Sequence, residues 1–423
     1  MVGVTDVDAA LTSAFSAEWG RVVATLIRLT GDFALAEDAA QDAFVAAARR
    51  WPVDGVPDRP GAWLTTTARN GALDRLRRAT TEARKLREVA AMDALELHGG
   101  ASAAENPDDG AGSAVTDDRL RLIFTCCHPA LPLESRVALT LRTLCGLTVP
   151  EIARAFGVGE AAMTKRLVRA RQKIAHAGIP YRVPADDVLP ERLDGVLAVL
   201  YLLFTEGYSA TAGPGVVRED LSAEAIRLTR VLAELVPDDA EVHGLLALEL
   251  AHDARRAART DAAGELVPLE EQDRALWDAR QAAAAADVLV RARRLTTDPG
   301  PYLLQAEVAV LHATAATAGA TDWAAVAGLY AQLARRAPSP YVDLSRAVAV
   351  AMADGVDAGL TLLDALDASG RLDGNHYLPA ARADLLRRAG RDPESAEAYR
   401  AALTHVTNDA ERRYLRRRLA EVS

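Results

Sequence analysis

Residues 60–78 alternate apolar and polar side chains with the period of an α-helix, and this pattern constrains the fold more than any other feature of the chain. Pro60 suits the first turn of a helix, where its missing N–H costs nothing. At about 100° per residue, the small and apolar side chains fall on one side of this helix. They are Leu64, Ala68, Gly71, Ala72 and Leu76. The segment is therefore predicted to be a helix that packs on this side.

The opposite side of the 60–78 helix combines an aromatic ring with hydroxyl, amide and charged groups. It carries Trp63, Thr66, Thr67, Asn70, Asp74 and Arg77, and Arg69, Arg75 and Arg78 lie in the same window. An exposed Trp beside such groups suits unstacked bases and phosphates. The alternative is a solvated helix face with one packed Trp, because charge-rich faces are common.

The composition favours an all-α protein of several domains. A chain of 423 residues has room for about two to four domains. Ala and Leu dominate and aromatic residues make up only 5%, which is typical of helical proteins. We find no apolar run long enough to span a bilayer and no basic leader, so we expect no membrane partner and no signal peptide. Three cysteines make no disulfide framework, which favours a cytoplasmic location.

A second basic window, residues 147–175, has the pattern of a helix-turn-helix. Thr148 caps a first helix with Pro150 in its first turn, Gly157 opens a tight turn, and residues 160–174 form the second helix. Its apolar side carries Met163, Leu167, Ala170 and Ile174, and its outer side carries Ala162, Lys165, Arg166, Arg169 and Lys173. Such a helix fits a DNA major groove. The alternative is an αα-hairpin with a solvated basic face.

The last third of the chain has the spacing of a helical repeat. Pro301, Pro340 and His376, each followed by Tyr, open Ala- and Leu-rich segments that start 39 and 36 residues apart. The tetratricopeptide period is about 34 residues. Stacked helix pairs bury a core jointly and leave a groove. The alternative is an irregular helical domain, because the match is loose and residues 192–300 do not show the period.

In this order, the parts of the chain resemble an extracytoplasmic-function (ECF) RNA polymerase sigma factor. Residues 10–90 resemble sigma region 2, residues 91–116 a flexible linker, and residues 117–177 sigma region 4. Residues 36–51 are similar to the segment of region 2 that binds the polymerase clamp. Residues 185–423, tetratricopeptide-like from about residue 300, are similar to the long helical extension of one ECF subgroup. The resemblance implies an all-α fold with a region 2 bundle, a region 4 helix-turn-helix and a helical extension.

The resemblance also implies partners and roles. The partners are core RNA polymerase, through its β′ clamp and β flap, and promoter DNA. No catalysis by this chain is implied, because the polymerase performs the chemistry, and no cofactor or metal ion is expected. The expected −10 contacts are Trp63, Thr66, Arg69, Asn70, Asp74, Arg77 and Arg78. The expected −35 contacts are Ala162, Lys165, Arg166, Arg169 and Lys173. The expected clamp contacts are Glu37, Asp38, Gln41, Asp42 and Phe44; alternatively, Glu37 and Asp38 only favour a helix N-terminus.

The connecting segments carry further expectations. Residues 53–59 form a loop able to wall a pocket for an extruded base. The acidic linker either passes where nascent RNA exits or is a plain spacer. The C-terminal extension acts as a built-in partner in place of a separate anti-sigma factor, because tethering raises effective concentration. The turn at residues 373–377 is either a plain turn or part of a functional groove.

The sequence also allows two classes of protein other than a sigma factor. One is a helix-turn-helix regulator whose repeat domain senses a ligand or a protein; such a regulator has no need of the 36–51 segment. The other is an enzyme within residues 190–423, for which no nucleophile motif or glycine-rich phosphate loop is found. Cys126, Cys127 and His128, with Cys145 downstream, do not have the spacing of structural zinc sites. Buried thiols are predicted instead.

Overall fold

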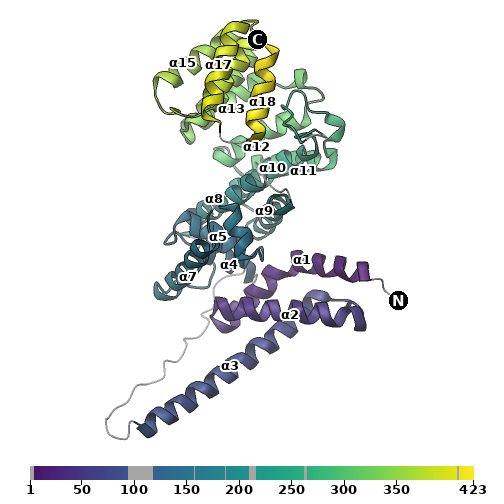
Figure 1. Cartoon of the computed structure of the whole chain (residues 1–423), viewed down its shortest axis with the longest axis vertical. Helices are drawn as coiled ribbons and strands as arrows, with labels where there is room; N and C mark the ends of the chain where they lie inside the picture. Colours follow the sequence, from purple (N-terminus) through teal and green to yellow (C-terminus); the bar gives the residue numbers. More distant parts are fainter. Residues whose placement is uncertain are drawn as a thin grey trace. The chain divides into compact units, whose positions relative to one another are not determined.

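The computed structural model describes residues 4–93, 118–156, 158–185, 187–208, 216–261, 264–406 and 409–423. These residues form helices joined by turns (Figure 1), and their β-structure is limited to an isolated antiparallel bridge between Thr260 and Leu266. The all-α prediction is confirmed. None of the helices in the described ranges is long and apolar enough to cross a membrane. Residues 94–116 of the predicted linker and Gly157 of the predicted turn lie outside these ranges.

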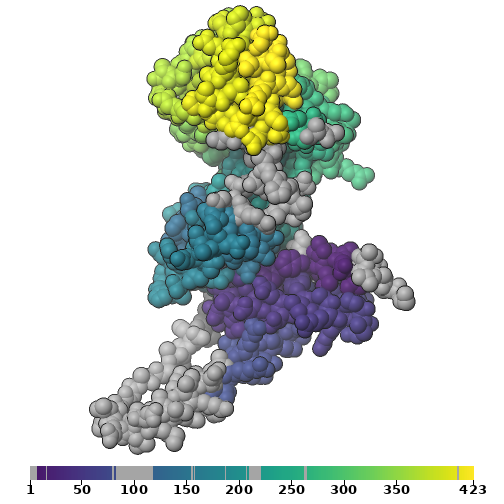
Figure 2. Space-filling model, viewed as in Figure 1, coloured from purple at the N-terminus to yellow at the C-terminus, as the bar shows by residue number. Residues whose placement is uncertain are grey.

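The chain divides into two compact units, Met1–Val199 and Leu200–Ser423. Figure 2 shows the atoms of the first unit in purple to teal and those of the second in teal-green to yellow. The first unit contains α1 (Val4–Thr30), α2 (Phe33–Asp54), α3 (Pro60–Asp93), α4 (Asp118–Cys126), α5 (Leu133–Thr143), α6 (Val149–Ala155), α7 (Glu160–His176) and the first part of α8 (Leu189–Tyr208). The second continues with α9 (Val216–Leu235), α10 (Ala240–Asp253), η1 (Arg256–Ala258), η2 (Arg274–Leu276), α11 (Ala279–Leu295), α12 (Pro301–Thr314), η3 (Ala318–Ala320), α13 (Trp323–Arg336), α14 (Pro340–Asp354), α15 (Val356–Ala368), α16 (Tyr377–Arg388), α17 (Asp392–His405) and α18 (Asp409–Glu421).

Helices α1, α2 and α3 pack against one another in the first unit. Asp32 begins α2 as its N-cap, because its carboxylate accepts hydrogen bonds from the Ala34 and Leu35 amides at 2.8 and 3.1 Å. Gly55, with φ of +85°, ends α2 and donates its N–H to the Trp51 carbonyl at 3.0 Å. Only glycine adopts this backbone conformation readily. Helix α3 then begins at Pro60, as predicted.

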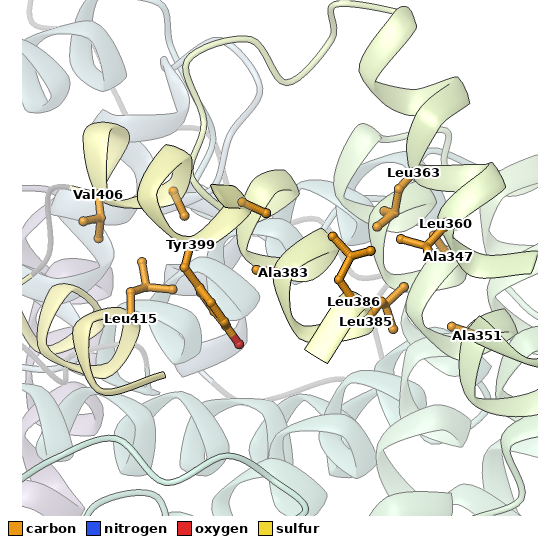
Figure 3. Packing of buried hydrophobic residues seen from close by; sticks show 12 residues of the cluster. Ala347, Ala351, Leu360, Leu363, Ala383, Leu385, Leu386, Tyr399, Val406 and Leu415 are labelled. Carbon is orange, nitrogen blue, oxygen red and sulfur yellow. The ribbon is translucent and has the colours of Figure 1, made fainter. Parts of the chain in front are cut away.

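The second unit is built from helix pairs with shared hydrophobic cores. Figure 3 shows one such core, in which Ala383 and Leu386 of α16 lie between Leu363 of α15 and Tyr399 of α17. Helices α14 and α15 approach closely at Gly359, where an added Cβ would lie 2.8 Å from the Ala347 carbonyl oxygen. A side chain at this position would therefore push the two helices apart.

The predicted repeat starts agree with helix starts in the second unit. Helices α12 and α14 begin at Pro301 and Pro340, and α16 begins one residue after His376. Each is followed by a second helix, α13, α15 and α17 respectively. Consecutive members of this series pack on one another. That the pairs are tetratricopeptide repeats remains a prediction.

Candidate nucleic-acid interface

Helix α3 turns the predicted apolar side into the first unit. Leu64, Ala68 and Ala72 are at most 2% exposed, whereas Leu76 is half-buried. These residues pack α3 against α1 and α2. The orientation predicted from the helical period is therefore confirmed, and it fixes which side of α3 faces outward.

The outward side of α3 is polar and accessible. Its exposed members are Thr66, Arg69, Asn70, Asp74, Arg77 and Arg78. Trp63 differs from the expectation of an exposed ring, because it is half-buried. Its indole packs edge-to-face on that of the buried Trp51, with 5.8 Å between ring centroids. This contact holds the Trp63 ring in one orientation and leaves part of it accessible.

The charges on this side of α3 are only partly compensated. Asp74 lies 3.6 Å from Arg77 in an ion pair one turn apart. By contrast, Arg69 and Arg78 have no carboxylate partner, and Asn70 no hydrogen-bond partner, among the described residues. Arg69 and Arg78 are nine residues apart, so at about 100° per residue they flank the outward side of α3 from opposite directions. Guanidinium groups and an amide in these positions suit phosphate oxygens and base edges.

The helix-turn-helix begins with the cap predicted at Thr148. The Thr148 amide and hydroxyl both donate to the Glu151 carboxylate at 2.7 Å, and the Glu151 amide returns a hydrogen bond to the Thr148 hydroxyl at 3.4 Å. This reciprocal arrangement is a capping box, which fixes the start of α6. Helices α6 and α7 pack against each other and both contact α5.

Helix α7 also presents the predicted sides. Its buried side consists of Met163, Leu167, Ala170 and Ile174. Its outer side consists of the exposed Ala162, Lys165, Arg169 and Lys173 and the half-buried Arg166. Arg166 lies 3.4 Å from the Glu134 carboxylate, and its guanidinium sits 5.4 Å from the centroid of the Phe156 ring. Arg166 must therefore break its ion pair with Glu134 before its guanidinium can contact DNA.

Helix α2 exposes three of the five residues predicted to contact polymerase. Asp38, Gln41 and Asp42 are all exposed. Arg75 of α3 pairs with both carboxylates, at 3.7 Å from Asp38 and in direct contact with Asp42. These pairs are more than a third exposed, so they contribute little to stability and are readily exchanged for a partner's charges.

Glu37, by contrast, is buried against helices of the second half of the first unit. Its carboxylate accepts from the Arg142 side chain of α5 at 2.9 Å and from that of Arg171 of α7 at 2.6 Å. The Thr143 hydroxyl donates a third hydrogen bond at 3.4 Å. Only 2% of Glu37 remains exposed. In this arrangement the carboxylate is not accessible to another protein.

Phe44 is half-buried and lies against α1. Its ring packs on those of Phe15 and Trp19, with centroids 5.1 and 6.0 Å apart. The Trp19 indole N–H in turn donates to the Thr143 carbonyl at 3.1 Å. Sequence reasoning missed this junction, because the partners of Glu37 stand more than a hundred positions away and no local pattern pairs them. The one available signal was the cluster of basic residues that includes Arg171.

Cys126 and Cys127 are buried thiols, as predicted, whereas Cys145 is half-buried. Burial raises the pKa of the Cys127 thiol to about 12, and burial, followed by the neighbouring Cys127, also raises that of Cys126. Thiols held protonated in this way are poor metal ligands. Within the described ranges, no group of three or more His, Cys, Asp or Glu side chains is arranged to hold a metal ion.

Three protein-family models match the chain. The model described as sigma-70 region 2 matches residues 15–82, and the one described as sigma-70 region 4 matches residues 121–174. A third, described as a family of unknown function (DUF6596), matches residues 192–293. The first match covers α3 as far as residue 82, the second covers α7 as far as residue 174, and the third begins in α8.

One curated relative matches nearly the whole chain, and others match about 40% of it. An uncharacterised protein of Rhizobium meliloti is 42% identical over 98% of this chain and 95% of its own length. The probable ECF RNA polymerase sigma factor SigI of Mycobacterium tuberculosis is 29% identical over 40% of this chain and 56% of its own length. The ECF RNA polymerase sigma factor SigL of the same species is 29% identical over 39% of this chain and 87% of its own length. No solved structure matches the chain.

Proposed function

We propose that this chain, which belongs to the ECF sigma factors, directs core RNA polymerase to specific promoters and initiates transcription there. The observation that carries the proposal is the pair of exposed basic helix faces, on α3 and α7. They lie in that order within the segments that match sigma-70 regions 2 and 4. A regulator that only binds duplex DNA needs the α7 face but not the α3 face.

Helix α7 is proposed to enter the major groove of the −35 element. Lys165, Arg169 and Lys173 are exposed on one side of the helix, and the capping box at Thr148 sets the position of the preceding helix. Arg and Lys can contact both guanine edges and phosphates. Ala162, at the start of the helix, is small enough to meet a thymine methyl group.

Helix α3 is proposed to read the opened −10 element. Arg69 and Arg78, exposed on the two flanks of the outward side, are proposed to bind phosphates, and Asn70 a base edge. Trp63, held by Trp51, offers an aromatic surface for an extruded base. Residues 55–59, between α2 and α3, are proposed to form the loop that completes a pocket for that base. Val53 and Asp54, expected in this loop, belong instead to the last turn of α2.

Polymerase is proposed to bind the exposed side of α2. Asp38, Gln41 and Asp42 are accessible for contacts with the β′ clamp, and region 4 contacts the β flap. The Phe44 ring is half-buried and packs on α1. The Glu37 carboxylate becomes available only when α5 and α7 separate from α2, because Arg142 and Arg171 cover it. Polymerase binding is therefore coupled to opening of the first unit.

The C-terminal extension is proposed to regulate this activity. It is covalently attached, so its concentration near the rest of the chain is high at any expression level. Comparing transcription by the full chain with that by a variant lacking residues 185–423 tests this role. Equal activity of the two at equal amounts of core polymerase would argue against regulation by the extension.

Run-off transcription with reconstituted core RNA polymerase tests the main proposal. The purified chain, added to core polymerase and promoter fragments selected from genomic DNA, should yield transcripts with defined starts. Asn70→Ala should lower transcript yield while leaving −35 binding unchanged, and Arg280→Ala, an exposed arginine on α11, serves as the matched control. Failure of the chain to bind core polymerase would refute the proposal.

A further inference from the structure

The second unit contains a cavity for which the proposed role in transcription requires no function. The cavity volume is about 460 Å³, within the range typical of small-molecule sites. Its walls come from the end of α8, the segment between α10 and η2, the start of α16 and the middle of α18. Part of the 373–377 turn, which the sequence left open as a plain turn or a groove wall, contributes His376 and Tyr377.

One wall of the cavity carries two arginines whose charges are not balanced. Arg255 donates to the Tyr208 hydroxyl and to His252 Nδ1, both at 3.0 Å. The Arg259 guanidinium lies 3.6 Å from the centroid of the same Tyr208 ring and donates to the Tyr208 carbonyl. Neither arginine has a carboxylate partner in the part of the chain that the structure describes. Each guanidinium has five N–H donors, so both retain unused donors.

The Glu411 carboxylate in the cavity wall already has partners within the chain. Glu411 accepts a hydrogen bond from the Tyr377 hydroxyl at 3.2 Å and lies 3.0 Å from His376 Nε2. No ion pair joins Glu411 to Arg255 or Arg259 among the described residues, and its single negative charge is fewer than the two positive charges of the arginines. The net unbalanced charge of the described walls is positive, which favours an anion.

The rest of the cavity is apolar and aromatic, with one polar exception. Leu266, Leu269 and Tyr414 are among its apolar lining residues. Gln272 also lines it, and this side chain is only 9% exposed. Its amide N–H donates to the Val267 carbonyl at 3.1 Å, but its carbonyl oxygen has no hydrogen-bond partner among the described residues. A buried acceptor without a donor is costly, so a ligand that donates there is favoured.

The walls are held in place before any ligand binds. Arg388 of α16 pairs with Glu270 at 2.6 Å, Arg418 of α18 pairs with Glu271, and Arg417 donates to the Leu266 carbonyl at 3.1 Å. These contacts tie the loop that lines the cavity to α16 and α18. A preformed site loses less entropy when it binds a ligand.

We propose that this cavity binds a small organic carboxylate with a flat apolar body and a hydroxyl or N–H donor. The carboxylate pairs with Arg255 and Arg259, whose planar groups match carboxylate geometry. The apolar body lies among Leu266, Leu269 and the tyrosines, and the donor satisfies the Gln272 carbonyl oxygen. The ligand thereby joins segments from both ends of the second unit.

Calorimetric titration of the full chain with 6-hydroxy-2-naphthoate tests the proposal. We expect saturable binding of one molecule per chain. Arg259→Gln should weaken binding about tenfold or more, because it removes a charged hydrogen-bond donor, and the uncharged methyl ester should bind the wild-type chain equally weakly. Arg280→Gln, an exposed arginine on α11 outside the cavity, should leave the affinity unchanged.

A second variant separates loss of binding from loss of folding. Ala380→Leu adds volume to the cavity wall and leaves both arginines in the sequence. It should also weaken binding, while the thermal unfolding curve stays close to that of the wild type. Absence of saturable binding would overturn the proposal. So would a result in which the wild-type chain binds the acid and the ester equally well and the Arg259→Gln chain binds the acid as tightly as the wild type does. The titration contains no polymerase and no DNA, so its outcome is independent of the role in transcription.

Discussion

Replacing Glu37 by Gln removes the charge at the junction between α2 and the helices α5 and α7. The Glu37 side chain is 3% exposed, and its two partners, Arg142 and Arg171, are 14% and 23% exposed. Glutamine has nearly the same size, so packing is preserved. The change leaves two largely buried guanidinium groups without their shared counter-ion, and it tests whether this junction holds the first unit together.

The expected loss follows from the burial of the three groups. Removing one partner of a buried ion pair costs about 3–5 kcal/mol. The substituted glutamine keeps one carbonyl oxygen as an acceptor, and both arginines retain some contact with water, so we expect the lower end, about 3 kcal/mol. Asp38→Asn is the matched control. Asp38 is 66% exposed and 3.7 Å from Arg75, so its replacement should cost at most about 0.5 kcal/mol.

Urea unfolding of the full chain at neutral pH measures this difference. Hydrogen exchange followed by mass spectrometry assigns the transition to the first unit, through peptides that cover α2, α5 and α7. A double variant, Glu37→Gln with Arg171→Gln, should lose less than the sum of the two single changes, because the two residues interact directly. Equal unfolding midpoints for Glu37→Gln and Asp38→Asn, or strict additivity in the double variant, would refute the reasoning.

Three further outcomes are expected. Arg169→Ala should weaken −35 binding by about 1–3 kcal/mol if Arg169 contacts a base, or reduce the salt dependence of binding if Arg169 contacts a phosphate. Fluorescence anisotropy with labelled promoter DNA measures both quantities. No change in either would contradict the placement of Arg169 at the DNA. Thr148→Ala removes the capping box and should destabilise the helix-turn-helix by about 1 kcal/mol in urea unfolding, whereas Thr164→Ala, an exposed position on α7, should cost less. Because the folded pKa of Cys127 is raised to about 12, its protonated thiol stabilises the fold fully below about pH 8.5, and this contribution falls as the pH rises toward the folded value. Because Cys145 is half-buried, the test uses a Cys145→Ser chain. Ellman's reagent at pH 8 should label this chain in urea but not when it is folded, and rapid labelling of the folded chain would contradict the burial of Cys127.

The sequence predicted the helix faces because they depend on local periodicity. Leu64 and Ala68 of α3 and Met163 and Leu167 of α7 all lie on the buried sides that a period of 3.6 residues assigns to them. The start of α3 at Pro60 follows from proline's own backbone preference. These features need no knowledge of distant parts of the chain.

The environment of the candidate site was harder to predict because it depends on contacts between distant segments. Nothing near Trp63 in the sequence shows that Trp51 covers part of its ring, since the two are joined by a loop whose path is set by Gly55. Glu37 has the type and spacing of a surface residue on an acidic helix. Its burial arises only because α5 and α7 bring arginines to it. Pairing at such separation leaves no periodic signal.

The covered side of α2 bears directly on how polymerase binding is controlled. Glu37 is a proposed polymerase contact, yet in this structure its carboxylate binds side chains of α5 and α7. Phe44, also a proposed contact, packs on aromatic rings of α1. One surface cannot serve both sets of contacts at once. Breaking the internal contacts therefore costs free energy that weakens polymerase binding. By thermodynamic linkage, polymerase binding weakens the internal contacts by the same amount. If polymerase binds Glu37 as proposed, it must break the contacts of Glu37 with Arg142 of α5 and with Arg171 of α7, the helix proposed to read the −35 element.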